Sequence, residues 1–159
     1  DLIASSFTIT PTRQEKVAFS RPYFSVWPLV VTGPGSPIDS VDDLAAATGA
    51  AIPGSSQEQR LLALGVRPGN IHHVPFTRDN LLAVAEGVVD YTLLDSTARN
   101  MMAEFDQLEV AFRIDEPERY GYAVVPGSDL LEPLNELLKE LEASGELGRI
   151  LDRHGVHRE

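Results

Sequence analysis

Short apolar runs alternate along the chain with polar segments that carry helix signals. The apolar runs predict strands over residues 2–4, 27–31, 50–52, 72–74, 88–94, 108–112 and 121–125. Helices are predicted from residue 11 and over residues 41–48, 59–64, 77–86, 96–105, 130–141 and 146–154. This repeated alternation predicts an α/β fold in which helices flank parallel-dominated sheets. With 159 residues, the chain can bury a core as one domain or as two small ones.

Several helix ends have recognisable signals. The spacing of Ser40 and Asp43 predicts a capping box with aspartate in place of glutamate. Gly87 and Gly155 each follow a predicted helix in the position where glycine ends it, and Pro133 fits only in a first helical turn. The leucines of the 130–141 helix predict core packing, because the stretch is too short for sustained heptads: they are Leu130, Leu131, Leu134, Leu137, Leu138 and Leu141.

Hydroxyl side chains and one arginine follow the first apolar run. Ser5, Ser6 and Thr8 come close together, and Thr10 precedes a proline that starts a helix or turn. Arg13 follows one turn later. A guanidinium can bind both oxygens of a carboxylate, while hydroxyls and backbone N–H groups donate to its remaining lone pairs. The same spacing also fits an ordinary strand-to-helix junction with a capping threonine and a surface arginine.

Two serines follow the short strand at 50–52. Ser55 and Ser56 come shortly before the helix predicted for residues 59–64. Helix N-termini bind anions through their free N–H groups and the helix dipole, so this segment is a candidate ligand-binding loop. One of the two serines is expected to cap its own helix, which leaves the other available to a ligand.

A third candidate is Asp95, at the carboxyl end of the strand predicted for residues 88–94. Open α/β sheets bind ligands outside the carboxyl ends of their strands, so Asp95 is placed to meet an ammonium group. Aspartate is also a preferred N-cap residue, and position alone leaves both roles open.

Residues 5–23, SSFTITPTRQEKVAFSRPY, resemble type 2 periplasmic solute-binding proteins of family 3, the branch that binds polar amino acids. The family pattern has hydroxyl-rich residues, T-P-x-R, a short helix and F-S-x-P-Y. Two further blocks agree, AEGVVDYTLLDS at 85–96 and YGYAVVPGS at 120–128, so the resemblance covers the whole chain. Within the superfamily, the block from residue 85 and the later LEVAF are most similar to the solute-binding-like module of membrane-bound lytic murein transglycosylases.

The resemblance implies two lobes joined by two crossings. Residues 1–26 and 119–159 would form the first lobe, and residues 27–118 the inserted second lobe. Because the chain opens inside an expected strand, we expect the first lobe to be incomplete at its N-terminus, where the family carries an aromatic residue that stacks on the ligand. We therefore expect this chain by itself to bind free amino acids weakly or not at all. The ligand-binding residues implied are Ser5, Ser6, Thr8, Arg13, Ser55, Ser56 and Asp95.

Three functions are compatible with the resemblance. The first is an extracytoplasmic receptor that captures a polar amino acid or similar zwitterion and delivers it to the membrane permease of an ABC transporter. The second is a sensing module of a lytic transglycosylase that binds amino acids or muropeptides, with its catalytic domain outside this chain. The third is an enzyme similar to cyclohexadienyl dehydratase, but no acid–base pair supports it. We expect a monomeric, non-enzymatic domain in the periplasm or outside the cell, compatible with a lipid or membrane tether.

Composition excludes several other classes. The formal net charge of −11 argues against nucleic-acid partners and against anionic membrane surfaces. The absence of cysteine excludes disulfides and thiolate chemistry. No apolar run has the length of a membrane span, and we expect any signal sequence to lie outside this chain.

Metal and cofactor chemistry also lack support. His72 and His73 are adjacent on a predicted strand and point to opposite faces, and His154 and His157 have no acidic partner at useful spacing. No G-x-S-x-G elbow, P-loop or dinucleotide fingerprint occurs, so we expect no cofactor. The charged run at 115–119 predicts a solvated loop.

Overall fold

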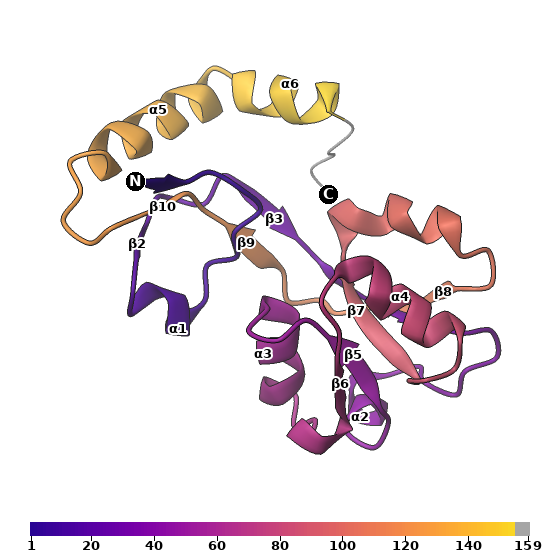
Figure 1. Ribbon diagram of the computed structural model, residues 1–159. Coiled ribbons are helices and arrows are strands. Elements are labelled where there is room, and N and C mark those ends of the chain that lie inside the picture. Colours follow the sequence, from indigo (N-terminus) through magenta and orange to yellow (C-terminus); the bar gives the residue numbers. More distant parts are fainter. Residues whose placement is uncertain (155–159) are drawn as a thin grey trace. The chain divides into compact units, whose positions relative to one another are not determined.

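The computed structural model describes residues 1–154, and the chain divides into two compact units (Figure 1). We call the unit formed by Asp1–Val26 and the residues from Glu118 onward the first lobe, and Trp27–Pro117 the second lobe. The second lobe is inserted into the first, so the chain passes between them twice. Glu118, which the sequence assigned to the inserted lobe, pairs with Val26 and therefore groups with the first.

The first lobe contains two small antiparallel sheets. Strand β10 lies between β1 and β2, and β3 pairs with β9. The predicted loop at 115–119 and strand at 121–125 are corrected here, because β9 takes up Glu118 and Arg119 and only a short β10 follows. The elements are β1 (Leu2–Ile3), α1 (Pro11–Gln14), β2 (Ala18–Phe19), β3 (Phe24–Val26), β9 (Glu118–Tyr120), β10 (Ala123–Val124), α5 (Leu131–Ala143) and α6 (Glu146–Arg153).

The second lobe is built on one five-stranded sheet in the order β6-β5-β7-β4-β8. Its elements are β4 (Pro28–Thr32), α2 (Val41–Leu44), β5 (Gly49–Ala51), α3 (Ser56–Ala63), η1 (Pro68–Asn70), β6 (Ile71–His73), α4 (Thr77–Ala85), β7 (Tyr91–Asp95), η2 (Ser96–Glu104) and β8 (Glu109–Arg113). The predicted α/β fold with flanking helices is confirmed. Parallel pairing, which we expected to dominate, is limited to β5 with β6 and β7, because β4 starts where β7 ends and so runs antiparallel to it.

The sheet of the second lobe is covered on both faces. Val30 and Leu93 pack in one buried cluster, whereas their chain neighbours Val31 and Leu94 pack in another, as the alternation of side chains along a strand requires. This double burial explains why β7 is almost continuously apolar. The strand begins at Tyr91 rather than at Val88, because Val88 is exposed after the helix-ending turn of α4.

Helix ends follow the sequence signals better than helix lengths do. Asp43 Oδ2 accepts hydrogen bonds from Ser40 N at 3.0 Å and Ser40 Oγ at 2.6 Å, and these bonds lower the pKa of the Asp43 carboxyl. Gly87 follows α4 with a φ of 70°, as predicted. However, α2 ends at Leu44 instead of near residue 48, and α3 starts at Ser56 instead of residue 59.

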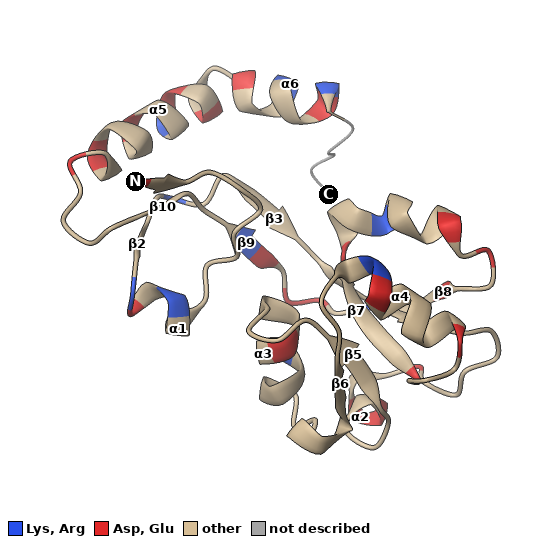
Figure 2. Ribbon diagram, in the orientation of Figure 1, with Lys and Arg blue, Asp and Glu red and all other residues tan. Residues whose placement is uncertain are grey.

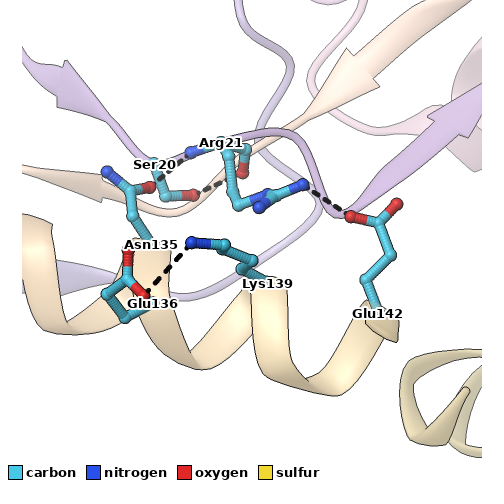
Figure 3. Close-up of polar contacts among 6 residues, drawn as sticks. All are labelled: Ser20, Arg21, Asn135, Glu136, Lys139 and Glu142. Atoms are coloured by element: carbon cyan, nitrogen blue, oxygen red, sulfur yellow. Dashed lines mark hydrogen bonds and ion pairs between the residues drawn. The ribbon is translucent and has the colours of Figure 1, made fainter. Parts of the chain in front are cut away.

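Helix α5 is attached to the turn after β2 by polar contacts (Figure 3). The Arg21 backbone N–H donates to Asn135 Oδ1 at 2.7 Å, and Arg21 Nη2 donates to Glu142 Oε2 at 2.6 Å. The leucine stripe contributes less to the core than predicted, since Leu138 is buried but Leu130 and Leu137 are exposed. Gly155, the predicted end of α6, lies outside the described residues. Within residues 1–154, no helix has the length and apolar character needed to cross a membrane.

Candidate ligand-binding site

Arg13 is held in a defined orientation by its own segment of the first lobe. Thr10 is the N-cap of α1, and its Oγ1 accepts a hydrogen bond from Arg13 N at 3.3 Å. Arg13 Nη1 donates to the Thr8 carbonyl at 2.9 Å, and the guanidinium carbon lies 4.2 Å from the centre of the Phe7 ring. The guanidinium is therefore oriented by a carbonyl and a cation–π contact while its other N–H groups can serve a ligand.

The three candidate hydroxyl residues near Arg13 have different environments. Ser5 and Ser6 are exposed, whereas Thr8 is only 4% exposed and gives its carbonyl to Arg13. The Ser5 carbonyl accepts a hydrogen bond from Tyr23 Oη at 3.0 Å, and the Tyr23 ring stacks on Tyr122 at 4.7 Å. Burial raises the pKa of Tyr23, so its hydroxyl stays a donor and holds this segment against the aromatic pair.

A buried carboxylate belongs to the same part of the first lobe. Glu118 is 8% exposed. Burial lowers the pKa of Arg13, and the negative charge of Glu118 offsets part of this lowering. Strand β9, which carries both an acidic and a basic residue (Figure 2), runs beside the segment that leads to α1. Glu118 was not among the predicted site residues, because a charged run usually lies in a solvated loop and nothing in the local sequence distinguishes its one buried member.

In the second lobe, the two candidate serines have separate roles. Ser55 is the N-cap of α3, and its Oγ accepts a hydrogen bond from Glu58 N at 3.1 Å. Ser56 is the first residue of α3 and is buried, and its hydroxyl lies 3.3 Å from Gln57 Oε1. The expectation that one of the pair caps the helix is confirmed, and Ser55 is that residue.

The structure brings the Ser55–Ser56 segment and Asp95 together. Strands β5 and β7 are parallel, so the segments that follow them lie at the same edge of the sheet. Gln57 Nε2 donates to Asp95 Oδ1 at 2.6 Å. Asp95 occupies the N-cap position of η2, but its side chain makes no capping hydrogen bond there. Gln57 was not among the predicted site residues, and its only signal in the sequence is that it directly follows the two serines.

His73 has a partner of another kind. His73 Nε2 lies 2.5 Å from Glu58 Oε1, and Glu58 Oε2 accepts a hydrogen bond from Gly54 N at 2.6 Å. Among residues 1–154, no group of three or more histidine, aspartate or glutamate side chains is arranged to hold a metal ion. His157, considered with His154 in the sequence analysis, lies outside the described residues.

The fold and these groups of side chains define a class, that of two-lobed solute-binding domains. Each lobe carries polar and charged side chains on segments that follow strands or begin helices, where backbone and side-chain donors converge. The chain belongs to the bacterial extracellular solute-binding proteins, family 3, whose family model matches residues 1–157.

Curated relatives share this domain as part of longer chains. Membrane-bound lytic murein transglycosylase F of Pseudomonas syringae pv. syringae (strain B728a) is 33% identical over 163 residues, which cover 97% of this chain and 32% of the relative. The protein of the same name from Idiomarina loihiensis is 31% identical over 168 residues, covering 99% of this chain and 36% of the relative. The chain thus spans about a third of the length of these relatives.

Solved structures with the same fold are amino-acid-binding proteins. A mutant of ArgBP from T. maritima is 30% identical, with a TM-score of 0.83, and the match covers 96% of this chain and 68% of that one. The GluR0 ligand-binding core from Nostoc punctiforme, solved in complex with (L)-glutamate, has a TM-score of 0.81 over 96% of this chain and 71% of that one. At 23% identity, the second likeness shows the fold alone.

Proposed function

We propose that this extracytoplasmic domain binds a polar amino acid or a similar zwitterion, with Arg13 as the receptor for the ligand's carboxylate. The observation that carries the proposal is the orientation of the Arg13 guanidinium by the Thr8 carbonyl and the Phe7 ring. Because these contacts leave further N–H donors of the guanidinium, Arg13 can bind a carboxylate bidentately. The hydroxyls of Ser5, Ser6 and Thr8 complete this proposed site in the first lobe.

The second lobe carries a candidate site of its own. Asp95 binds the ammonium group of the ligand, and Gln57 keeps its carboxylate in place through the 2.6 Å hydrogen bond. Ser55 and Ser56 add hydroxyl and backbone donors at the start of α3. The family membership supports this division of roles, since solved relatives include arginine-binding proteins.

Two cellular roles are compatible with such a domain. In the first, it is the receptor of an ABC transporter and passes its amino acid to a membrane permease. A structure described as the substrate binding protein of an amino acid ABC transporter supports this role, with 26% identity and a TM-score of 0.83 over 96% of this chain. In this role the domain acts as a monomer, released or tethered outside the cytoplasm.

In the second role, the domain is a ligand-sensing module of a lytic murein transglycosylase and responds to amino acids or muropeptides. The 33% identity to transglycosylase F over 97% of this chain favours it. The catalytic domain would then lie elsewhere in the protein, and the present chain would itself catalyse nothing. The complete gene separates the two roles, because a glycosidase-like domain beside this one favours the second.

A thermal-shift screen tests the proposed binding. The product of the complete gene is heated with each of the common amino acids and with a set of muropeptides. A ligand that binds only the native state raises the unfolding midpoint, and the rise grows with ligand concentration. We expect at least one amino acid or muropeptide to raise the midpoint, and to lose this effect when Arg13 is changed to alanine. A screen in which none does so overturns the proposal.

A further inference from the structure

A buried acid lies beside the proposed carboxylate receptor. Glu118 is 8% exposed, although it immediately follows the exposed segment that ends at Pro117. Long charged side chains are rarely buried unless an opposite charge lies nearby.

The strand pairing of the first lobe places the segment that contains Glu118 beside the segment that leads to Arg13. Thr8 forms an antiparallel bridge with Tyr120, and the Ile9 N–H donates to the Arg119 carbonyl at 2.8 Å. The two segments thus run side by side in opposite directions. Two residues beyond the Thr8–Tyr120 bridge, this register places Glu118 opposite Thr10, the N-cap of α1. Arg13 reaches back to the Thr8 carbonyl at 2.9 Å, within this same pair of segments. The electrostatic influence of Glu118 on Arg13 agrees with this placement.

We propose that Glu118 is the positioning residue that balances the charge of Arg13, and that it makes the first lobe prefer a zwitterion to a simple carboxylate. This inference rests on the proposed function of Arg13. With Glu118 ionised, its negative charge offsets part of the positive charge of Arg13 before the ligand arrives. A ligand carboxylate bound to Arg13 is then repelled by Glu118, whereas an ammonium group next to that carboxylate is attracted by it.

The ratio of two affinities isolates this effect. Calorimetry on the complete gene product gives the affinity of L-arginine divided by that of 5-guanidinopentanoic acid, which lacks only the α-amino group. Glu118→Gln keeps the shape of the side chain and removes its charge, so this ratio should fall about three- to tenfold. The matched control is Glu140→Gln, an equal change of charge at an exposed position of α5 in the same lobe, and it should leave the ratio unchanged.

A conservative variant distinguishes charge from structure. Glu118→Asp retains the carboxylate and should keep the ratio closer to that of the wild type than Glu118→Gln does. If Glu118→Gln does not fold, Glu118→Thr, which removes the charge and suits a strand, is measured in its place with the same expected fall. A ratio that stays at the wild-type value in the folded, uncharged variant overturns the inference.

The experiment distinguishes a failure of this inference from a failure of the proposed function. If Arg13→Ala abolishes L-arginine binding but the uncharged Glu118 variants leave the ratio unchanged, the receptor role of Arg13 stands and the inference about Glu118 falls. If L-arginine does not bind the wild type, L-glutamate and glutaric acid serve as the probe pair. Failure of both amino acids to bind overturns this inference, while the wider screen of amino acids and muropeptides still decides the proposed function.

Discussion

The side-chain amide of Gln57 donates to Asp95 Oδ1 at 2.6 Å and joins two segments that are 38 residues apart in the sequence. Gln57 lies in the first turn of α3, and Asp95 is the last residue of β7. The bond exists because β5 and β7 run parallel, which brings the segments after both strands to one edge of the sheet. A hydrogen bond to a charged group fixes the orientation of the Asp95 carboxylate.

Asp95→Asn tests the proposed ammonium site. Asparagine can still accept the hydrogen bond from Gln57, and the Asp95 side chain makes no capping hydrogen bond that could be lost, so stability should change little. The charge opposite the ammonium is lost, and hydrogen bonds to charged groups contribute about 1.5–3 kcal/mol. Calorimetry should therefore show an affinity for L-arginine that is about ten- to a hundredfold lower.

The control ligand for Asp95→Asn is 5-guanidinopentanoic acid, which lacks the α-amino group of L-arginine. Its affinity should fall much less, because it has no ammonium group to lose a partner. An equal loss for L-arginine and 5-guanidinopentanoic acid would indicate a general disturbance of the lobe. No loss with either probe would contradict the role of Asp95 in binding.

Gln57→Ala should weaken ligand binding without removing any charge. The Asp95 carboxylate loses the donor that orients it, and a bond of this kind contributes about 1.5–3 kcal/mol, part of which is regained from water. We expect a severalfold lower affinity by calorimetry, with a nearly unchanged unfolding midpoint. Gln59→Ala is the matched control, because Gln59 lies in the same helix and its backbone N–H, not its side chain, makes the bond to Ser55. Equal affinities for the Gln57 and Gln59 variants would refute the positioning role.

Arg13→Ala should cost more than any other single change in the proposed site. The substitution leaves the ligand carboxylate without its receptor, and removing one partner of a desolvated charge pair costs about 3–5 kcal/mol. Arg13→Lys should recover only part of the affinity, because an ammonium cannot reproduce the two parallel hydrogen bonds of a guanidinium or its contact with Phe7. Calorimetry on both variants gives the comparison, and unchanged affinity in Arg13→Ala would show that the carboxylate binds elsewhere.

Gly49→Ala should destabilise the second lobe. A Cβ at this position would lie 2.8 Å from Cζ and 2.9 Å from Cε2 of Tyr91, whose ring is fully buried and whose hydroxyl donates to the Leu44 carbonyl at 3.2 Å. Such overpacking costs about 1–3 kcal/mol. Gly148→Ala is the contrasting control, because among residues 1–154 no atom outside its chain neighbours and the backbone of helix α6 lies within 4 Å of the added Cβ. Alanine there should stabilise by about 0.5–1 kcal/mol. Urea unfolding curves measure both changes, and a neutral Gly49→Ala would mean that Tyr91 can move.

Much of the local structure could be predicted from the sequence, because its causes are local. Ser40 and Asp43 form their capping box and Gly87 ends its helix, since both effects depend on a few neighbouring residues. The family, the α/β fold and the helix-start position of Ser55 follow equally from short motifs. The spacing from the first hydroxyls to Arg13 also indicated the candidate site of the first lobe, because the contacts that orient Arg13 come from Thr8 and Thr10, a few residues earlier in the chain.

Only the tertiary structure decided which residues from distant parts of the sequence lie beside each candidate site. Glu118 appears in the sequence as one more charge in an acidic run, and it is buried only because β9 pairs with β3 and with the segment before α1. Gln57 finds Asp95 only because two strands far apart in sequence are parallel neighbours. Strand pairing and side-chain burial depend on long-range contacts, which local propensity does not encode. For that reason the sequence determined the kinds of residues in the site, and the fold determined their partners.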